Sequence, residues 1–529
     1  MTGHVATRTR FLPAAGCHAP RLRWRRWWRR RGPDGRCRLD GRRVPAGQQL
    51  SARCAAPRTG TDPVTGKAYP DRAGSVLYEN NWLRSWSHDL YLWYGEILDQ
   101  DPGTFGTAAA YFKVLKTTAT TASGAAKDKF HFTYDTAQWE ALSSTGTSAG
   151  YGPQWEILGD GRPPRDVRIA WMEASAPATA TEASLGRGAQ LLAVDGVDMV
   201  NGSDTATLNA GLFPAAAGET HSFTVTGPGA LGRRTLSLVS ANVTPASVRG
   251  VQSLVQPGGT VGYIQFNDHL AASQAQLVNA FTTLQQAGVG DLVLDIRYNG
   301  GGYLDIASEV AYMIAGGTRT AGKTFEIIRF NSKYPTTDPV AGGAIAPTPF
   351  HSTTLSFQGS TLPAGQALPT LNLARVFVLT GSGTCSASEA IINSLRGIGV
   401  DVIQVGSTTC GKPYGFYPQD NCGTTYFTIE FQGVNATGFG NYPDGFTPQN
   451  SGLAVDPGAQ LPGCSVADDY SRELGDPAEG RFAAALAYRV DGICHVPASG
   501  IAPRQLQQLR PQDGGGLRRP EVREIRLLR

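Results

Sequence analysis

Hydrophobic and polar positions follow a helical period near the start of the main body of the chain. Residues 78–95 place three tryptophans and a leucine at helical spacing, which predicts an amphipathic helix whose aromatic stripe packs into a core. Helical pattern also covers residues 105–115 and 136–142, with a polar loop between them. We therefore expect a small helical region over residues 63–150.

A second region has short strand-like runs separated by turns. The runs that predict strands are 167–172, 190–194, 222–225 and 235–239. We expect a β-rich domain over residues 155–247. Within it, residues 184–197 resemble the middle of a PDZ domain, in which a glycine turn leads into a strand and an Asp-Gly turn. A generic β-rich domain is the alternative.

A third region alternates strands with helices from residue 250 onward. The predicted strands are 261–266, 291–295, 375–379 and 402–405, and the predicted helices are 271–287, 304–314 and 386–395. Such alternation requires crossover connections, which produce a largely parallel sheet. The fold class is therefore α/β, with its principal domain over residues 248–495.

Three consecutive glycines, Gly300, Gly301 and Gly302, follow the predicted strand at 291–295 and precede a helix. Glycine lets backbone N–H groups approach a ligand closely, and the N-terminus of a helix favours negative charge. The turn is thus suited to hold an oxyanion or a phosphate. It does not fit the glycine patterns of nucleotide-binding proteins, which argues against a nucleotide. A tight turn without a ligand is the alternative.

A serine lies at another strand-to-helix turn. Ser386 follows the strand at 375–379, at a position where the N–H groups that open the helix can stabilise an oxyanion. The spacing of Ser386 and Glu389 also predicts a capping box. The two roles are compatible, because the helix needs a cap and a nucleophile needs a rigid mount.

A lysine follows the next predicted strand. Lys412 comes after the strand at 402–405, one helix and one strand beyond Ser386, so both residues can return to the same edge of the sheet. A lysine can act as a general base only where a dry site lowers its pKa towards neutrality. A solvated loop lysine is the alternative.

These three features together resemble the S41 peptidases, the C-terminal processing or tail-specific proteases. The resemblance covers about residues 75–460 and rests on Leu294–Gly302, Ser386–Glu389 and Gly411-Lys412. It implies a crotonase/ClpP-like α/β catalytic core preceded by a PDZ-like domain. It also implies a Ser/Lys dyad that needs neither a metal nor an organic cofactor.

The resemblance further implies a role for each matching residue. Ser386 would be the nucleophile and Lys412 the base, with oxyanion donors from Ala387 N–H and the turn Gly300–Gly302. Many family members have glycine directly after the lysine and glutamine four positions beyond it, where this chain has proline and Phe416. The orientation of the lysine therefore depends on other groups.

Two further residues are auxiliary candidates. His269 lies at the end of the strand at 261–266, where it could contribute to catalysis or contact substrate, although a lone histidine is more often structural. Glu389 is the other, through its place in the serine motif.

Composition and charge narrow the class of protein. The 529 residues are 41% hydrophobic and 17% charged, which excludes a disordered chain. No long uninterrupted apolar run is present, so we expect no transmembrane helix. Basic residues concentrate in the head, residues 1–62, and in a tail over residues 496–529, whereas the body is acidic. A nucleic-acid partner is therefore not expected.

The head has three interpretations. Residues 21–31 are rich in arginine and tryptophan but lack an apolar segment beside them, so they are not a secretory signal as written. The head is either a disordered anion-binding tail, a membrane-surface segment, or a mis-called start that replaced an export signal. We favour the last.

Eight cysteines bear on the compartment. Cys410 and Cys422 flank a turn-rich stretch and could pair, and Cys464 could pair with Cys494, leaving Cys385 free. Bridges would indicate a periplasmic or secreted protein. Reduced thiols in a cytosolic enzyme are the alternative. Neither Cys-x-x-Cys nor a histidine-rich spacing occurs, so no metal site is expected.

The leading hypothesis is a periplasmic or secreted serine endopeptidase that acts on proteins or peptides. The PDZ-like domain would present unstructured C-terminal tails of substrates or gate the site, because such modules capture an extended peptide as an added strand. The alternative is a catalytically weak or inactive relative that binds peptides or apolar ligands. A third hypothesis is an anionic-surface binder driven by the basic head. The sequence leaves the oligomeric state open.

Overall fold

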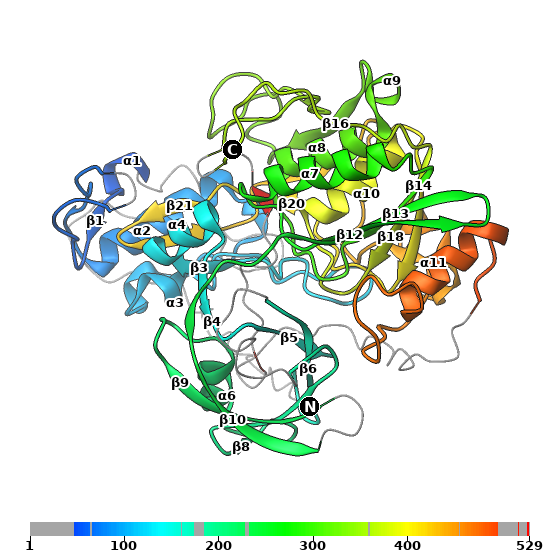
Figure 1. Ribbon diagram of the computed structural model, residues 1–529. Helices are drawn as coiled ribbons and strands as arrows, with labels where there is room; N and C mark the ends of the chain where they lie inside the picture. The colour runs from blue at the N-terminus through cyan, green and yellow to red at the C-terminus, as the bar shows by residue number, and fades with distance from the viewer. Residues whose placement is uncertain are drawn as a thin grey trace, which may run out of the picture.

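The computed structural model describes residues 47–63, 66–159, 161–173, 185–227, 232–357, 360–453, 455–495, 517 and 526–527. Its centre is a six-stranded mixed sheet (Figure 1). In spatial order the strands are β12 (Val248–Gln256), β13 (Gly259–Phe266), β14 (Asp291–Asp295), β18 (Arg375–Thr380), β19 (Asp401–Gly406) and β26 (Gly463–Ser465). The β12–β13 pair is antiparallel and the other pairs are parallel.

Helices cover both faces of this sheet (Figure 1). The helices are α7 (Ser273–Gln286), α8 (Leu304–Ala315) and α10 (Ala387–Gly397) on one face and α11 (Gly480–Asp491) on the other. In β14, Leu292 and Leu294 pack under the three helices, whereas Val293 faces the α11 side. A strand buried on both faces has a continuous apolar sequence, which is why this one is recognisable.

The predicted α/β pattern is confirmed in this region. β14 has the predicted bounds, and the other predicted strands and helices lie within one to three residues of their expected ends. β12, β26 and α11 were not predicted. β12 pairs antiparallel with β13, so no crossover helix separates the two strands in the sequence. The strand–helix alternation that predicted the other strands is therefore missing here.

A second unit contains an antiparallel sheet. Its path is β10–β9–β7–β6–β5, with β8 beside β7. The elements are β5 (Pro153–Leu158), β6 (Asp166–Met172), β7 (Gln190–Val194), β8 (Val197–Asp198), α6 (Thr205–Leu212), β9 (Thr220–Thr226) and β10 (Arg233–Val239). β4 (Ser148–Gly150) and β11 (Ala241–Val243) form a short ribbon beside it. The four predicted strands of this region are all present.

The helical part of the chain packs against strands of the α/β region that follow α10. Its helices are α1 (Gly47–Leu50), α2 (Val76–Leu90), α3 (Ala108–Phe112) and α4 (Thr136–Thr145). Trp82 and Trp86 stack at 5.5 Å and contact Tyr426 edge-on, so the aromatic stripe is core as predicted. β3 (Phe132–Asp135) pairs with β22 (Thr424–Phe427), which ties this part to the chain after Lys412.

Shorter strands and turns complete the chain. They are β1 (Arg53–Cys54), β2 (Arg72–Ala73), β15 (Gly302–Tyr303), α9 (Gly317–Thr320), β16 (Thr324–Arg329), β17 (Thr348–Pro349), β20 (Tyr414–Gly415), β21 (Gln419–Asn421), β23 (Phe431–Val434), β24 (Thr447–Pro448), β25 (Gln460–Leu461) and β27 (Arg526–Leu527), with 3₁₀ turns at Tyr94–Glu96, Pro102–Thr104, Gln449–Ser451 and Pro457–Ala459. Among the described residues, no helix has the length and apolarity to cross a membrane.

The boundary expected at residue 62 was wrong. Residues 47–62 belong to the folded body, because Cys54 is buried and forms a disulfide with Cys422, and Ala52 N–H donates to Asn421 Oδ1 at 2.8 Å. The basic segment of the predicted head lies outside the described residues. So does most of the predicted tail, except residue 517 and β27.

The described residues form three disulfides, of which one was predicted. Cys464 and Cys494 form the predicted bridge. The other two join Cys54 to Cys422 and Cys385 to Cys410, so the expected Cys410–Cys422 pair and the free Cys385 were both wrong. Cys54 lies within the predicted head, so a pairing drawn only from the body cysteines gives Cys422 the wrong partner.

Candidate active site

Ser386 occupies a strained position at the start of α10. It is the N-cap residue, with a positive φ of 64° and ψ of −115°, in a region that side-chain-bearing residues rarely adopt. Its side chain is fully buried, and Oγ has no hydrogen-bond partner among the described residues. A serine in a sharp strand-to-helix turn with an unengaged hydroxyl is the arrangement that nucleophiles of hydrolases use.

Glu389 connects the serine turn with the lysine loop. Its Oε2 accepts the N–H of Ser386 at 2.9 Å and the N–H of Lys412 at 2.8 Å. Its Oε1 accepts Gly411 N–H at 2.9 Å and Thr409 Oγ1 at 2.5 Å. Ser386 and Glu389 thus have the predicted capping-box arrangement. Its firm bond is the one from Ser386 N–H to Glu389 Oε2, because Ser386 Oγ has no hydrogen-bond partner among the described residues.

Burial raises the pKa of Glu389, and hydrogen bonds from Thr409 and from backbone N–H groups oppose that rise. Four donors to one buried carboxyl group are the arrangement expected for an ionised carboxylate. Glu389 therefore places a negative charge beside the serine turn without a cationic side chain opposite it in these contacts.

The side chain of Lys412 is fully buried and lies against two aromatic rings. Its Nζ is 4.3 Å from the ring centroid of Phe416 and 4.7 Å from that of Phe130. Burial disfavours the ammonium form, whereas the negative faces of the rings favour it. Phe416 therefore lies beside the amine at the sequence position where many family members have glutamine.

The glycine turn lies beside the serine turn. Asn299 O accepts the N–H of Cys385 and the hydroxyl of Ser388, both at 3.0 Å. Gly301 N–H already donates to Asn299 Oδ1 at 2.9 Å, so it is engaged within the turn. A Cβ at Gly302 would lie 2.4 Å from His269 O, and φ there is +135°, so this position requires glycine.

His269 packs against the same turn. Asn299 Nδ2 donates to Phe266 O at 3.0 Å, which orients the amide so that its Oδ1 faces His269 Nδ1 at 3.0 Å. Nδ1 is therefore the protonated nitrogen, and Nε2 has no partner among the described residues. Burial lowers the pKa of His269 to about 3, so the ring is neutral around pH 7.

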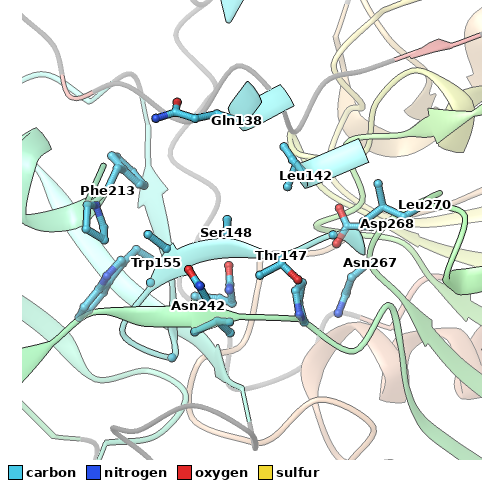
Figure 2. Close-up of a pocket in the computed structure, with 18 of the residues that line it drawn as sticks. Gln138, Leu142, Thr147, Ser148, Trp155, Phe213, Asn242, Asn267, Asp268 and Leu270 are labelled. Atoms are coloured by element: carbon cyan, nitrogen blue, oxygen red, sulfur yellow. The ribbon is translucent and has the colours of Figure 1, made fainter. Parts of the chain in front are cut away.

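A cavity of about 570 Å³ opens between the β-rich unit, α4 and the glycine turn (Figure 2). At the end formed by the α/β region, the lining includes His269, Gly301, Gly302 and Tyr303. Ser386 and Lys412 are fully buried and do not line it. The glycine turn and the fully buried His269 thus line the cavity, whereas the predicted dyad does not.

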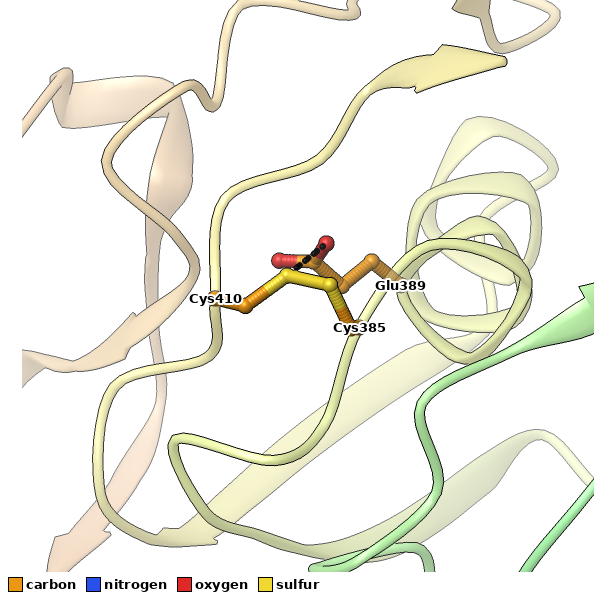
Figure 3. Close-up of side chains that lie close together, drawn as sticks. All are labelled: Cys385, Glu389 and Cys410. Atoms are coloured by element: carbon orange, nitrogen blue, oxygen red, sulfur yellow. Dashed lines mark hydrogen bonds between the residues drawn. A yellow bond between two sulfur atoms is a disulfide. The ribbon is translucent and has the colours of Figure 1, made fainter. Parts of the chain in front are cut away.

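The disulfide Cys385–Cys410 lies directly beside Glu389 (Figure 3). Cys410 Sγ is 3.5 Å from Glu389 Oε2. The two sulfur atoms and the carboxylate lie as close together as the ligands of a metal ion would. No other such group occurs among the described residues. A metal ligand must be a thiolate, however, and sulfurs bonded to each other are not.

A buried ionic cluster surrounds the residues that directly precede the glycine turn. Arg297 pairs with Glu479 and Asp468, and Arg187 of the β-rich unit donates to Asp468 at 2.6 Å and to Tyr298 at 2.8 Å. Burial raises the pKa of Asp468, but the surrounding arginines lower it by more and hold the carboxyl group ionised. The cluster joins the β-rich unit to the residues directly before Asn299.

No local sequence pattern indicates these partners, apart from the position of Arg297 in its motif. The structure therefore brings together Ser386, Glu389 and the Lys412 loop, and separately the glycine turn with His269.

Comparisons with known proteins identify the family that the central segment of the chain resembles. Residues 260–416 match the sequence profile of peptidase family S41. The chain is 31% identical over 177 residues to a carboxyl-terminal-processing protease of Picosynechococcus sp., and 26% identical over 181 residues to one of Synechocystis sp.. These matches cover 32% of this chain and 38% of each relative. The resemblance to the S41 peptidases is confirmed.

A solved structure described as an S41 protease from Bacteroides fragilis has the same fold. It superposes with a TM-score of 0.54 at 21% sequence identity, covering 81% of this chain and 99% of the other. The likeness supports the mixed α/β fold of S41 proteases.

Proposed function

We propose that this chain, whose residues 260–416 carry the S41 segment, is a serine endopeptidase with Ser386 as nucleophile and Lys412 as general base. The observation that carries the proposal is the shared carboxylate of Glu389, which holds the backbone of both residues on one oxygen atom. An unengaged serine hydroxyl and a buried lysine support it.

The proposed reaction is acyl transfer through a covalent intermediate. The neutral amine of Lys412 takes the proton of Ser386 Oγ as this oxygen attacks the carbonyl carbon of the scissile bond. The resulting ammonium returns the proton to the leaving amine. Water, deprotonated by the same amine, then attacks the acyl-enzyme and releases the new carboxyl end and Ser386. No metal or organic cofactor takes part.

Oxyanion stabilisation is assigned to backbone N–H groups. Ala387 N–H opens α10, so it belongs to the set of helix N–H groups that lack an acceptor within the helix. Of the glycine turn we retain Gly300 and Gly302 as donors, because the N–H of Gly301 is already engaged with Asn299. Donors mounted on a rigid turn need no reorganisation as charge develops.

The substrate would bind as an extended peptide beside the glycine turn. β27 pairs in parallel with β15, with Arg526 beside Gly302 and Leu527 beside Tyr303. This edge thus accepts an extended backbone a few residues from Asn299. A protein tail of similar conformation is the substrate class that such an edge selects.

The β-rich unit is proposed to be PDZ-like and to present substrate tails or gate the cavity. Its antiparallel strands, helix α6 and the turn at Asp195 are compatible with this assignment. The contact of Arg187 with Tyr298 gives a physical link between this unit and the glycine turn. We propose domains over residues 148–243 and 248–495, with the N-terminal helical part packed on the second.

The compartment is proposed to be oxidising, as in a periplasm or the exterior. Three disulfides among the described cysteines support this assignment. The reduced cytosolic alternative would require all three pairs to remain thiols at bonding distance.

A matched set of variants tests the function. The full chain, Ser386→Ala, Lys412→Ala and His269→Gln are compared for hydrolysis of an unfolded protein. We expect activity only in the first and, at a reduced level, in the histidine variant. Activity retained by Lys412→Ala but lost in His269→Gln would move the base to His269, whose Nε2 is unprotonated. A folded but inactive full chain would favour the peptide-binding alternative.

A further inference from the structure

We infer that the Cys385–Cys410 disulfide is a positioning bridge of the active site, which holds the lysine loop against the serine turn and makes activity depend on its oxidised state. The inference rests on the proposed function, because it assigns a role for the bridge in Ser386 and Lys412 chemistry. It concerns a bridge between the two loops that carry the dyad.

The bridge lies next to both proposed catalytic residues in the sequence. Cys385 directly precedes Ser386, and Cys410 comes two residues before Lys412. A covalent bond between these cysteines therefore joins the two loops at their closest approach to the chemistry. The described bridges Cys54–Cys422 and Cys464–Cys494 have no such neighbours.

Hydrogen bonds cross the same junction on both sides of the bridge. Cys410 N–H donates to Thr384 O at 2.9 Å, which continues the contact between the loops. Glu389 adds its bonds to Gly411 and Lys412 directly beyond Cys410. Without the bridge, the serine turn and the lysine loop would be connected mainly through hydrogen bonds to the buried Glu389 carboxylate.

Reduction is chemically accessible from one side. Cys385 is fully buried, whereas Cys410 is half-buried. A thiol reductant would attack the Cys410 sulfur, forming a mixed disulfide and releasing Cys385 as a thiol after it takes up a proton. A second thiol would then release Cys410 and leave the oxidised disulfide of the reductant. The bridge gains two electrons and two protons in total.

The nearby carboxylate of Glu389 opposes this reaction, because it disfavours a leaving thiolate beside it. We therefore expect the bridge to persist under weak reductants and to open under strong dithiols. Activity should follow the state of this one bridge, measured by mass spectrometry of alkylated peptides.

The test compares two bridge deletions in the full chain. The variant Cys385→Ala/Cys410→Ala removes the site bridge, and Cys464→Ala/Cys494→Ala is its control. The sequence separations are 25 and 30, so the two deletions release similar loop entropy and should lower the unfolding temperature to a similar extent. Only the first deletion touches the junction of the catalytic loops.

We expect the site-bridge variant to lose roughly 100-fold in kcat with KM nearly unchanged, because a small misplacement of reacting groups has that effect. The rising limb of its pH profile should move to higher pH as the lysine becomes more solvated. The control should keep its kcat and its profile. Equal losses in both variants, or full activity in the first, would overturn the inference.

A second measurement covers the case in which the site-bridge variant does not fold. Hydrogen exchange of Gly411 and Lys412 N–H is compared in the oxidised and reduced full chain while tryptophan fluorescence reports the fold. We expect faster exchange at these two groups on reduction, and unchanged exchange would overturn the inference. This readout needs no hydrolysis. An oxidised chain that lacks Ser386-dependent activity but shows the exchange change would refute the proposed function alone.

Discussion

The backbone N–H groups of Ser386 and Lys412 donate to the same oxygen atom, Oε2 of Glu389, at 2.9 and 2.8 Å. The two nitrogen atoms can therefore be no farther apart than the sum of these distances. One helix and one strand separate the residues in the sequence, and the carboxylate closes that separation. The proposed dyad thus depends on a third residue that fixes both main chains.

Replacing this carboxylate should affect catalysis more than folding. In Glu389→Gln, an NH₂ group takes the place of one acceptor oxygen and faces N–H donors. We expect kcat to fall by at least about tenfold, since aligned groups lose their common support. Steady-state kinetics and circular dichroism measure the two effects.

Glu309→Gln is the matched control. Glu309 is also a fully buried glutamate, and its Oε1 accepts Gln274 Nε2 at 2.7 Å and Leu355 N–H at 3.2 Å away from the serine turn. Similar losses of kcat in both variants would show that Glu389 acts only through stability.

The ring of Phe416 should influence the pH at which Lys412 acts as a base. In Phe416→Leu the ring whose centroid lies 4.3 Å from Lys412 Nζ is lost, while the site stays apolar. Because the ring stabilises the ammonium, its removal favours the neutral amine. The rising limb of the kcat/KM profile should move to lower pH by roughly half a unit to one unit.

Phe427→Leu is the control for that profile. Phe427 packs against Phe416 at 5.2 Å, so the two substitutions disturb the same aromatic cluster. Phe427 is not among the rings found over the lysine amine. A shift of equal size in both variants would contradict the direct effect of the ring.

The sequence predicted the central sheet because burial on both faces leaves a local pattern, as in β14 at 291–295. It also predicted Ser386, Glu389 and Lys412 as candidates, from short motifs at strand ends. It could not predict that Cys54 bonds to Cys422, because a separation of 368 residues is closed only by tertiary packing. The contact between Phe130 and Lys412 could not be predicted for the same reason, because the two residues lie far apart in the sequence.

A buried histidine should make stability depend on pH. His131 stacks on Phe112 at 3.7 Å between ring centroids, and burial lowers its pKa to about 4. Below the unfolded value of about 6.5 the unfolded chain binds the extra proton and the folded chain does not, so stability falls as pH decreases towards 4. Between pH 7 and 5 the loss from this group is roughly 2 kcal/mol.

Urea unfolding of the full chain and of His131→Gln at both pH values isolates this effect. Raised carboxyl pKa values, such as that of Glu389, act in the opposite direction but are common to both proteins. The difference in unfolding free energy between the two should therefore shrink at pH 5. A difference that stays constant between pH 7 and pH 5 would show that folding does not change the pKa of this ring, and would contradict the prediction.

The pairing of β27 with β15 predicts competition at the substrate edge. Because Arg526 and Leu527 lie beside Gly302 and Tyr303, they occupy the edge on which we place the peptide. Deleting residues 525–529 should lower KM for a peptide substrate several-fold, with kcat little changed. Residue 517, which packs in the core of the β-rich unit, is kept so that stability is preserved.

A synthetic peptide of residues 520–529 should inhibit the shortened protein competitively. An unchanged KM together with no inhibition would show that this edge does not bind substrate.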